Sequence, residues 1–127
     1  MWWGTAVEVA DPATLARFYS ELLDWPLVHE EPGTAVLASA PPDAPGGAVF
    51  HVFMQVDDYV APTWPGVEGA QRAMMHLDLQ VGDLEEAVGE AVELGATLAD
   101  HQPHPDHLRV LLDPAGRPFC LCLETED

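Results

Sequence analysis

The chain has 127 residues, which suits one compact domain, and 48% of them are hydrophobic, enough to build a core. Its 22 acidic residues against 4 basic ones give a formal net charge of −18. Such a surface should repel nucleic-acid phosphates and anionic membranes, so both partners are disfavoured. No segment approaches the roughly 20 continuous apolar residues of a membrane-spanning helix.

The compartment is predicted from the first residues and the cysteines. Met1–Gly4 lacks the basic and apolar regions of a signal peptide. Cys120 and Cys122 lie two residues apart, and a disulfide at that spacing on a strand would be badly strained. Free thiols fit a reducing environment, so we expect a cytoplasmic protein.

One pattern occurs twice along the chain. An alternating segment at residues 5–10 ends at Asp11, and a second at 76–82 ends at Asp83. Both aspartates are good helix N-caps. Apolar residues at helical spacing then predict helices over about 12–24 and 84–94.

Short strands separated by turn residues should follow each helix. They are expected at about 27–30, 35–38 and 48–55 in the first copy, and at 97–101, 108–112 and 118–124 in the second. The chain is therefore predicted to be a single α+β domain over 1–127. It would contain module one (about 1–56), a Pro/Gly-rich linker (about 57–72) and module two (about 73–127), each a βαβββ unit.

Several short motifs recur in a characteristic order over nearly the whole chain. They are Ala16–Tyr19 followed by Leu23–Pro26, the linker segments Gln55–Tyr59 and Pro62–Pro65, the strand His76–Leu79, and the terminal Asp113–Cys120. In this order the chain resembles the glyoxalase-like subgroup of the vicinal oxygen chelate superfamily. The resemblance implies a curved eight-stranded mixed sheet around a cavity, the glyoxalase/bleomycin-resistance fold.

The resemblance also implies where a metal would be held, because metal enzymes of this superfamily take ligands from the first and last strands of each module. In module two these positions hold His76, which matches, and Cys120, where glutamate is usual. In module one the first position is Gly4, which cannot coordinate, and the second lies near His51. We therefore expect no metal at the usual site. The alternative is a zinc site of His51, His76 and Cys120, with Glu8 or Asp78 as a fourth ligand.

Alternation along the strands predicts which side chains face the cavity. The ligand-pocket candidates on the strands and linker are His51, Phe53, Gln55, Trp64, His76, Asp78, Cys120 and Cys122. Of these, His51, Phe53 and Gln55 are the hardest to assign, because both faces of their strand are apolar.

Several of these residues have a plainer interpretation. His76 could be a ligand, a general base or a hydrogen-bonded strand histidine. The cysteines could be nucleophiles, but buried cysteines usually act as small hydrophobes. Trp64 could contact a ligand or simply pack. Arg109 could anchor an anion or form a surface salt bridge. The His101, His104 and His107 tract is better explained as a polar loop than as a metal site.

Three functions remain open, and the catalytic residues cannot be named. The first is a small-molecule-binding protein without the usual metal site, acting in resistance or sequestration or as an accessory domain. The second is a lyase, isomerase or dioxygenase that uses Zn, Ni, Mn or Fe as a Lewis acid. The third is an interaction module in which Trp2 and Trp3 form a homodimer interface.

Overall fold

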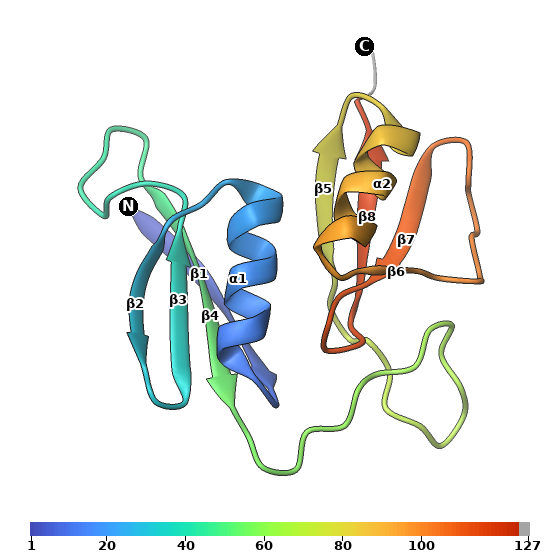
Figure 1. The fold of residues 1–127 in the computed structure, drawn as a ribbon, viewed down its shortest axis with the longest axis horizontal. Coiled ribbons are helices and arrows are strands. Elements are labelled where there is room, and N and C mark those ends of the chain that lie inside the picture. The colour runs from blue at the N-terminus through green and yellow to red at the C-terminus, as the bar shows by residue number, and fades with distance from the viewer. Residues whose placement is uncertain (125–127) are drawn as a thin grey trace. The chain divides into compact units, whose positions relative to one another are not determined.

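The computed structural model describes residues 1–124, in which both copies of the repeated pattern fold as strand, helix and three further strands (Figure 1). Module one contains β1 (Trp2–Val9), α1 (Pro12–Leu23), β2 (Leu27–Glu31), β3 (Thr34–Ala38) and β4 (Ala48–Gln55). Module two contains β5 (Leu77–Val81), α2 (Leu84–Leu94), β6 (Thr97–Leu98), β7 (Leu108–Leu112) and β8 (Pro118–Leu123). The predicted α+β class and tandem βαβββ modules are confirmed.

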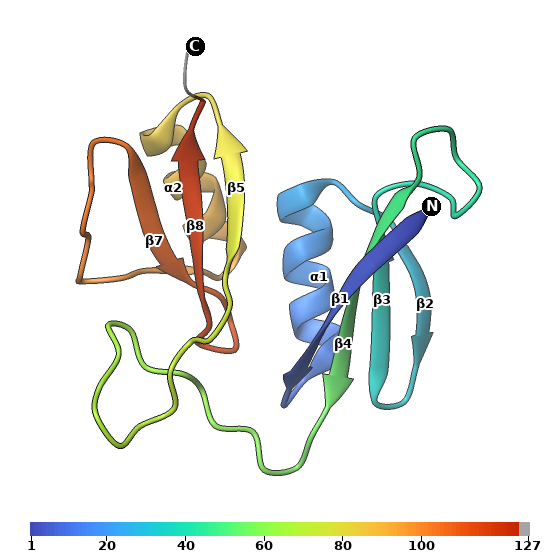
Figure 2. The ribbon, with the colours of Figure 1, turned by 180° about the vertical axis from the view of Figure 1, so that it is seen from behind.

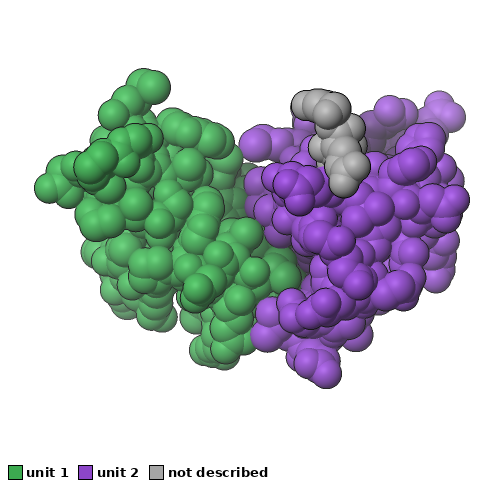
Figure 3. Space-filling model, turned by 90° about the horizontal axis from the view of Figure 1, so that it is seen from above, with its two compact units in different colours: residues 1–59 green, residues 60–127 purple. Residues whose placement is uncertain are grey.

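Each module forms its own four-stranded mixed sheet. The orders are β1-β4-β3-β2 and β5-β8-β7-β6, with the first and last strands of each module pairing in parallel. The remaining neighbours are antiparallel. The chain divides into two compact units, Met1–Tyr59 and a second that begins at Val60 (Figure 3).

The helices begin where the capping aspartates predict. The Asp11 carboxylate accepts a hydrogen bond from the Thr14 backbone N–H at 3.3 Å, and Asp83 accepts one from Glu86 N–H at 3.0 Å. These bonds satisfy backbone donors that a helix leaves unpaired at its start. At the other end α1 stops at Asp24, which adopts a left-handed conformation with φ 56°. Neither helix is long and apolar enough to cross a membrane.

Each helix buries one face of its own sheet. In module one, Leu15, Phe18 and Tyr19 of α1 are buried in the same core as Leu37 and Phe53 of the sheet. In module two, α2 packs on β7 and β8, where Leu111, Phe119 and Leu121 are buried. We call the opposite side of each sheet its open face. Figure 2 shows the open face of module two, with the strands in front of α2.

The long connections of module two are held by side chains. Trp64, from the predicted linker, belongs to this unit and donates its indole N–H to the carbonyl of His101 at 3.2 Å. The histidine tract lies in the loop between β6 and β7, as expected. Arg109 forms a salt bridge with Glu85 of α2 at 2.8 Å, which agrees with the plainer interpretation of this arginine.

Candidate functional site

The open face of module two brings three potential ligands together. Asp78 on β5 lies opposite Cys120 on β8, and His76 precedes Asp78 by two residues, so the alternation of the strand places all three side chains on one face. His76 Nδ1 lies 3.1 Å from Asp78 Oδ1. One nitrogen, oxygen or sulfur atom from each of the three residues lies within 4.8 Å of the others. The predicted faces of β5 and β8 are thus found in the structure.

Cys120 forms the floor of this cluster. It is only 7% exposed and packs with Ala99 and Val110 in an apolar group. Trp64 and Cys122 pack against the same group. The indole of Trp64 therefore covers part of the open face while its N–H binds backbone, so packing accounts for its position. The cluster combines a dry apolar floor with two exposed polar side chains, His76 and Asp78.

Both thiols are poor nucleophiles in this environment. Burial, followed by the negative charge of Asp78, raises the pKa of Cys120 from 9.0 to about 11. The neighbouring Cys122 and a hydrogen bond to Asp78 act in the same direction. The pKa of Cys122 is also raised, by burial and by Asp78. The surroundings of Cys120 and Cys122 therefore favour the neutral thiol form, whereas a reactive cysteine has a lowered pKa.

We expect Cys120 to react slowly with iodoacetamide in metal-free protein at mildly alkaline pH. The reactive thiolate fraction falls about tenfold per unit of pKa, so labelling should be roughly 100-fold slower than in urea-unfolded protein. The rate should climb with pH until it approaches the raised pKa. Mass spectrometry of peptides containing each cysteine would follow labelling, with Cys120→Ser as the control. Rapid labelling at neutral pH would instead indicate an activated nucleophile.

The open face of module one does not hold the side chains that were predicted for it. His51 is 5% exposed; its ring centroid lies 5.5 Å from that of Tyr19 of α1, and its Nδ1 shares a hydrogen bond with the Thr5 hydroxyl. Phe53 is fully buried and stacks on Tyr19. The assignment of His51 and Phe53 to the cavity face is therefore wrong, because these residues pack beneath the helix. His51 also lies outside the donor cluster of module two, so the predicted zinc set of His51, His76 and Cys120 is not the one that the structure assembles.

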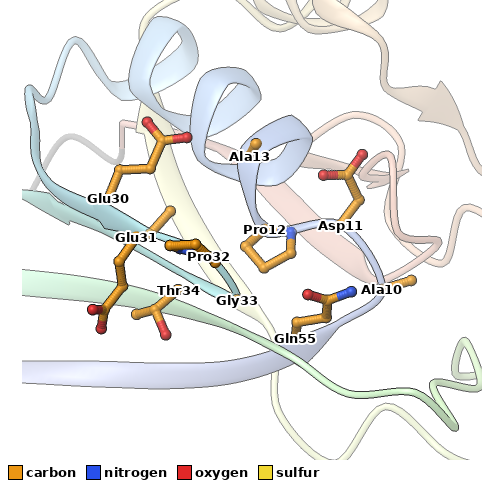
Figure 4. A pocket seen from close by; sticks show the side chains of 11 residues that line it. Ala10, Asp11, Pro12, Ala13, Glu30, Glu31, Pro32, Gly33, Thr34 and Gln55 are labelled. Atoms are coloured by element: carbon orange, nitrogen blue, oxygen red, sulfur yellow. The ribbon is translucent and has the colours of Figure 1, made fainter.

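Gln55 shares the strand parity of His51 and Phe53 and lies near the start of α1. It lines a hollow of about 680 Å³ between that helix end and the β2–β3 turn (Figure 4). Asp11, Glu30 and Glu31 also border the hollow, and the Asp11 carboxylate is already bound to Thr14. The assignment of Gln55 to the cavity face is therefore corrected as well.

The two strand registers identify equivalent positions in the modules. Gly4 and His76 both lie seven residues before the capping aspartate. Ala6 and Asp78 both lie five before it; Ala6 pairs with Val52 and Asp78 pairs with Cys120. Val52 is therefore the counterpart of Cys120. Module one presents glycine and valine where module two presents histidine and cysteine.

Backbone packing explains why glycine occupies position 4. A Cβ at Gly4 would lie 2.8 Å from the carbonyl oxygen of Phe50 and 3.1 Å from its Cβ. This approach is closer than carbon and oxygen normally tolerate, so β1 and β4 would have to separate. Gly4 therefore offers no coordinating side chain, and the group of potential metal ligands found among residues 1–124 lies in module two.

The open face of module one carries an aromatic pair instead. The rings of Trp2 and Phe50 meet edge to face with centroids 5.3 Å apart, and Trp2 is 60% exposed. Their strand parity is that of Gly4 and Val52, so all four lie on the same face. Trp2 was predicted only as part of a homodimer interface. The sequence did contain a signal for this position, because Trp2 lies two residues from Gly4 and side chains at that spacing on a strand share a face.

Comparison with known proteins agrees with this architecture. The sequence model of the family described as Glyoxalase-like domain matches residues 4–122. No curated protein matches the chain. Among solved structures, a glyoxalase/bleomycin resistance protein/dioxygenase family enzyme from Burkholderia phytofirmans has a TM-score of 0.65 at 16% identity, covering 94% of this chain and 95% of that one.

Two further structures extend the comparison. A glyoxalase-related enzyme from Fulvimarina pelagi has a TM-score of 0.61 at 21% identity, with 95% of this chain and 86% of that one covered. A mutant of the fosfomycin resistance protein FosX from Listeria monocytogenes, complexed with Mn(II) and 1S,2S-dihydroxypropylphosphonic acid, has a TM-score of 0.66 at 13% identity, covering 94% and 86%. At these identities the likeness concerns the fold alone.

Proposed function

Because the chain belongs to the glyoxalase-like domain family, we propose that it binds a small, partly apolar organic molecule without the two-module metal centre of metal-dependent relatives. The observation that carries this proposal is that Gly4 and Val52 of module one occupy the positions equivalent to His76 and Cys120 of module two. Two of the four positions that hold metal ligands in metal-dependent relatives therefore carry no side-chain donor atom in this chain. The proposed role is sequestration or resistance, and a fosfomycin resistance protein is among the structural relatives.

Apolar and aromatic side chains on the open faces support a ligand of this kind. Trp2 and Phe50 present a ring pair on module one, and Trp64 lies beside the apolar group of module two. Aromatic rings supply large contact areas at small entropic cost, and binding sites combine such surfaces with a few polar groups. The formal charge of −18 favours a neutral or cationic molecule over an anion.

A thermal-shift screen tests the proposal, followed by calorimetry on the compounds that stabilise the protein. Neutral or cationic aromatic antibiotics should stabilise it more than the anionic glutathione adducts and 2-oxo acids. Trp2→Ala should weaken binding of a positive compound about tenfold, because an aromatic contact is lost. Trp3→Ala is the matched control, since it removes a neighbouring exposed tryptophan of opposite strand parity. Equal losses in both variants, or no stabilising compound in a broad screen, would contradict the proposal.

A second candidate function is a divalent-metal-dependent lyase, isomerase or dioxygenase, favoured by the cluster of His76, Asp78 and Cys120. When bound, a metal ion would act as a Lewis acid on substrate oxygens. This candidate predicts close to one equivalent of Zn, Ni, Mn or Fe in the purified protein and its loss in His76→Ala. Metal analysis that finds none in either protein would eliminate it.

A further inference from the structure

We propose that module two alone forms a zinc-selective half-site in which His76, Asp78 and Cys120 are the three protein ligands. It differs from the family pattern in two respects. Asp78 lies outside the positions that the family uses for ligands, and no ligand comes from module one. The inference rests on the second candidate function, for which it names the ion and the ligand set. It is independent of the first, because binding of an organic molecule to the aromatic surfaces does not require the zinc.

The geometry supplies one fixed donor and two adjustable ones. Cys120 is anchored in the buried floor of the sheet, while the side chains of His76 and Asp78 are 42% and 62% exposed. Tetrahedral zinc with bonds of about 2.0–2.3 Å places its ligand atoms roughly 3.5 Å apart. The donors already lie within 4.8 Å of one another. Closing the site therefore requires the ligand atoms to approach one another by no more than about 1.3 Å, and the two exposed side chains are the ones free to move.

The donor types select the ion. Imidazole nitrogen with a thiolate sulfur suits zinc, whereas Mg²⁺, Ca²⁺ and Mn²⁺ prefer carboxylate, carbonyl and water oxygens. When zinc binds, the Cys120 thiol loses its proton to solvent as the zinc–sulfur bond forms. Three protein ligands leave a fourth position for water or a ligand atom, which is the arrangement of open zinc sites. The −18 formal charge attracts cations generally, so selectivity must come from the sulfur.

Metal titrations of the full chain, after chelator treatment and dialysis, test the half-site. Zinc competition against a chromophoric chelator should give one equivalent, and Mn²⁺ should bind at least about 100-fold more weakly. Co²⁺ should produce a thiolate charge-transfer band in the near ultraviolet. Cys120→Ser should abolish this band and lower zinc affinity about 100-fold, and His76→Ala and Asp78→Asn should each lower it by at least about tenfold.

Two controls make the result specific. Cys122→Ser removes a thiol from the same strand and face but outside the donor cluster, and His104→Ala removes a histidine of the β6–β7 loop. Both should retain the Co²⁺ band and the zinc affinity. Because His76 and Asp78 are exposed, their variants should stay folded even where Cys120→Ser is destabilised, and thermal denaturation checks this.

The proposal is overturned by absent zinc uptake, by Mn²⁺ binding as tightly as Zn²⁺, or by unchanged affinity in His76→Ala and Asp78→Asn. These readouts are independent of the ligand screen. Failure of zinc binding with intact, Trp2-dependent ligand binding rejects the half-site only. Zinc binding without any organic ligand rejects the small-molecule proposal only.

Discussion

Replacing Phe53 with alanine should lower the free energy of unfolding by about 3–5 kcal/mol, because the phenyl ring is fully buried beneath α1 and its removal leaves a cavity. Phe53 stacks on Tyr19 and meets the ring of His51 edge to face. Both contacts would be lost together. Urea denaturation followed by circular dichroism measures the change directly.

Phe50→Ala is the matched control for this prediction. It removes the same side chain from the same strand, but on the open face, where Phe50 is only partly buried. Its effect on stability should be clearly smaller. If Phe50→Ala cost as much as Phe53→Ala, the two faces of β4 would be assigned incorrectly.

A methyl group at Gly4 should destabilise the protein by about 1–3 kcal/mol, the usual cost of forcing extra volume into a packed site. The new Cβ would stand 2.8 Å from the Phe50 carbonyl oxygen, and the parallel β1–β4 pair would have to open to relieve the contact. Thermal and urea denaturation of Gly4→Ala would show the loss.

Gly82→Ala provides the comparison, because a Cβ there would meet no atom within 4 Å. Its stability should change by less than about 0.5 kcal/mol. The same contact predicts that Gly4→His, which restores the usual ligand type, gains no metal affinity. A stable Gly4→His variant with a new high-affinity ion would show that β1 can shift to admit the side chain.

The sequence was informative wherever one face of an element was polar. On β5, the polar residues Asp78 and Gln80 alternate with apolar ones, so both the strand and its faces were predicted correctly. Capping aspartates fixed the helix starts within a residue for the same kind of reason, since each side chain has one local partner.

Prediction failed on β4, where both faces are apolar and the pattern Phe50–Gln55 carries no signal for its orientation. The deciding information was the pairing of Val7 with Phe53, a contact between residues far apart in sequence. Val7 shares its face of β1 with the buried Val9, so this register places Phe53 and His51 on the helix side of the sheet. Pairing register is set by the packing of the whole sheet, which alternation alone does not encode.

The extent of β6 was also overestimated, because it ends at Leu98 rather than His101. Beyond Leu98, the side chain of Gln102 takes over hydrogen bonds that the backbone of a longer β6 would form with β7. Its amide donates to the carbonyls of Ala99 and Val110 at 2.8 Å, and its oxygen accepts from Val110 N–H at 2.9 Å. A glutamine side chain imitating backbone in this way leaves no periodic trace in the sequence.

The glycine and valine of one repeat stand at the places that histidine and cysteine occupy in the other. Two identical subunits related by a twofold axis would have to carry every substitution in both copies at once. Fusion of the repeats into one polypeptide releases that constraint. Each repeat can then mutate alone, so one can specialise in shape and the other in coordination chemistry.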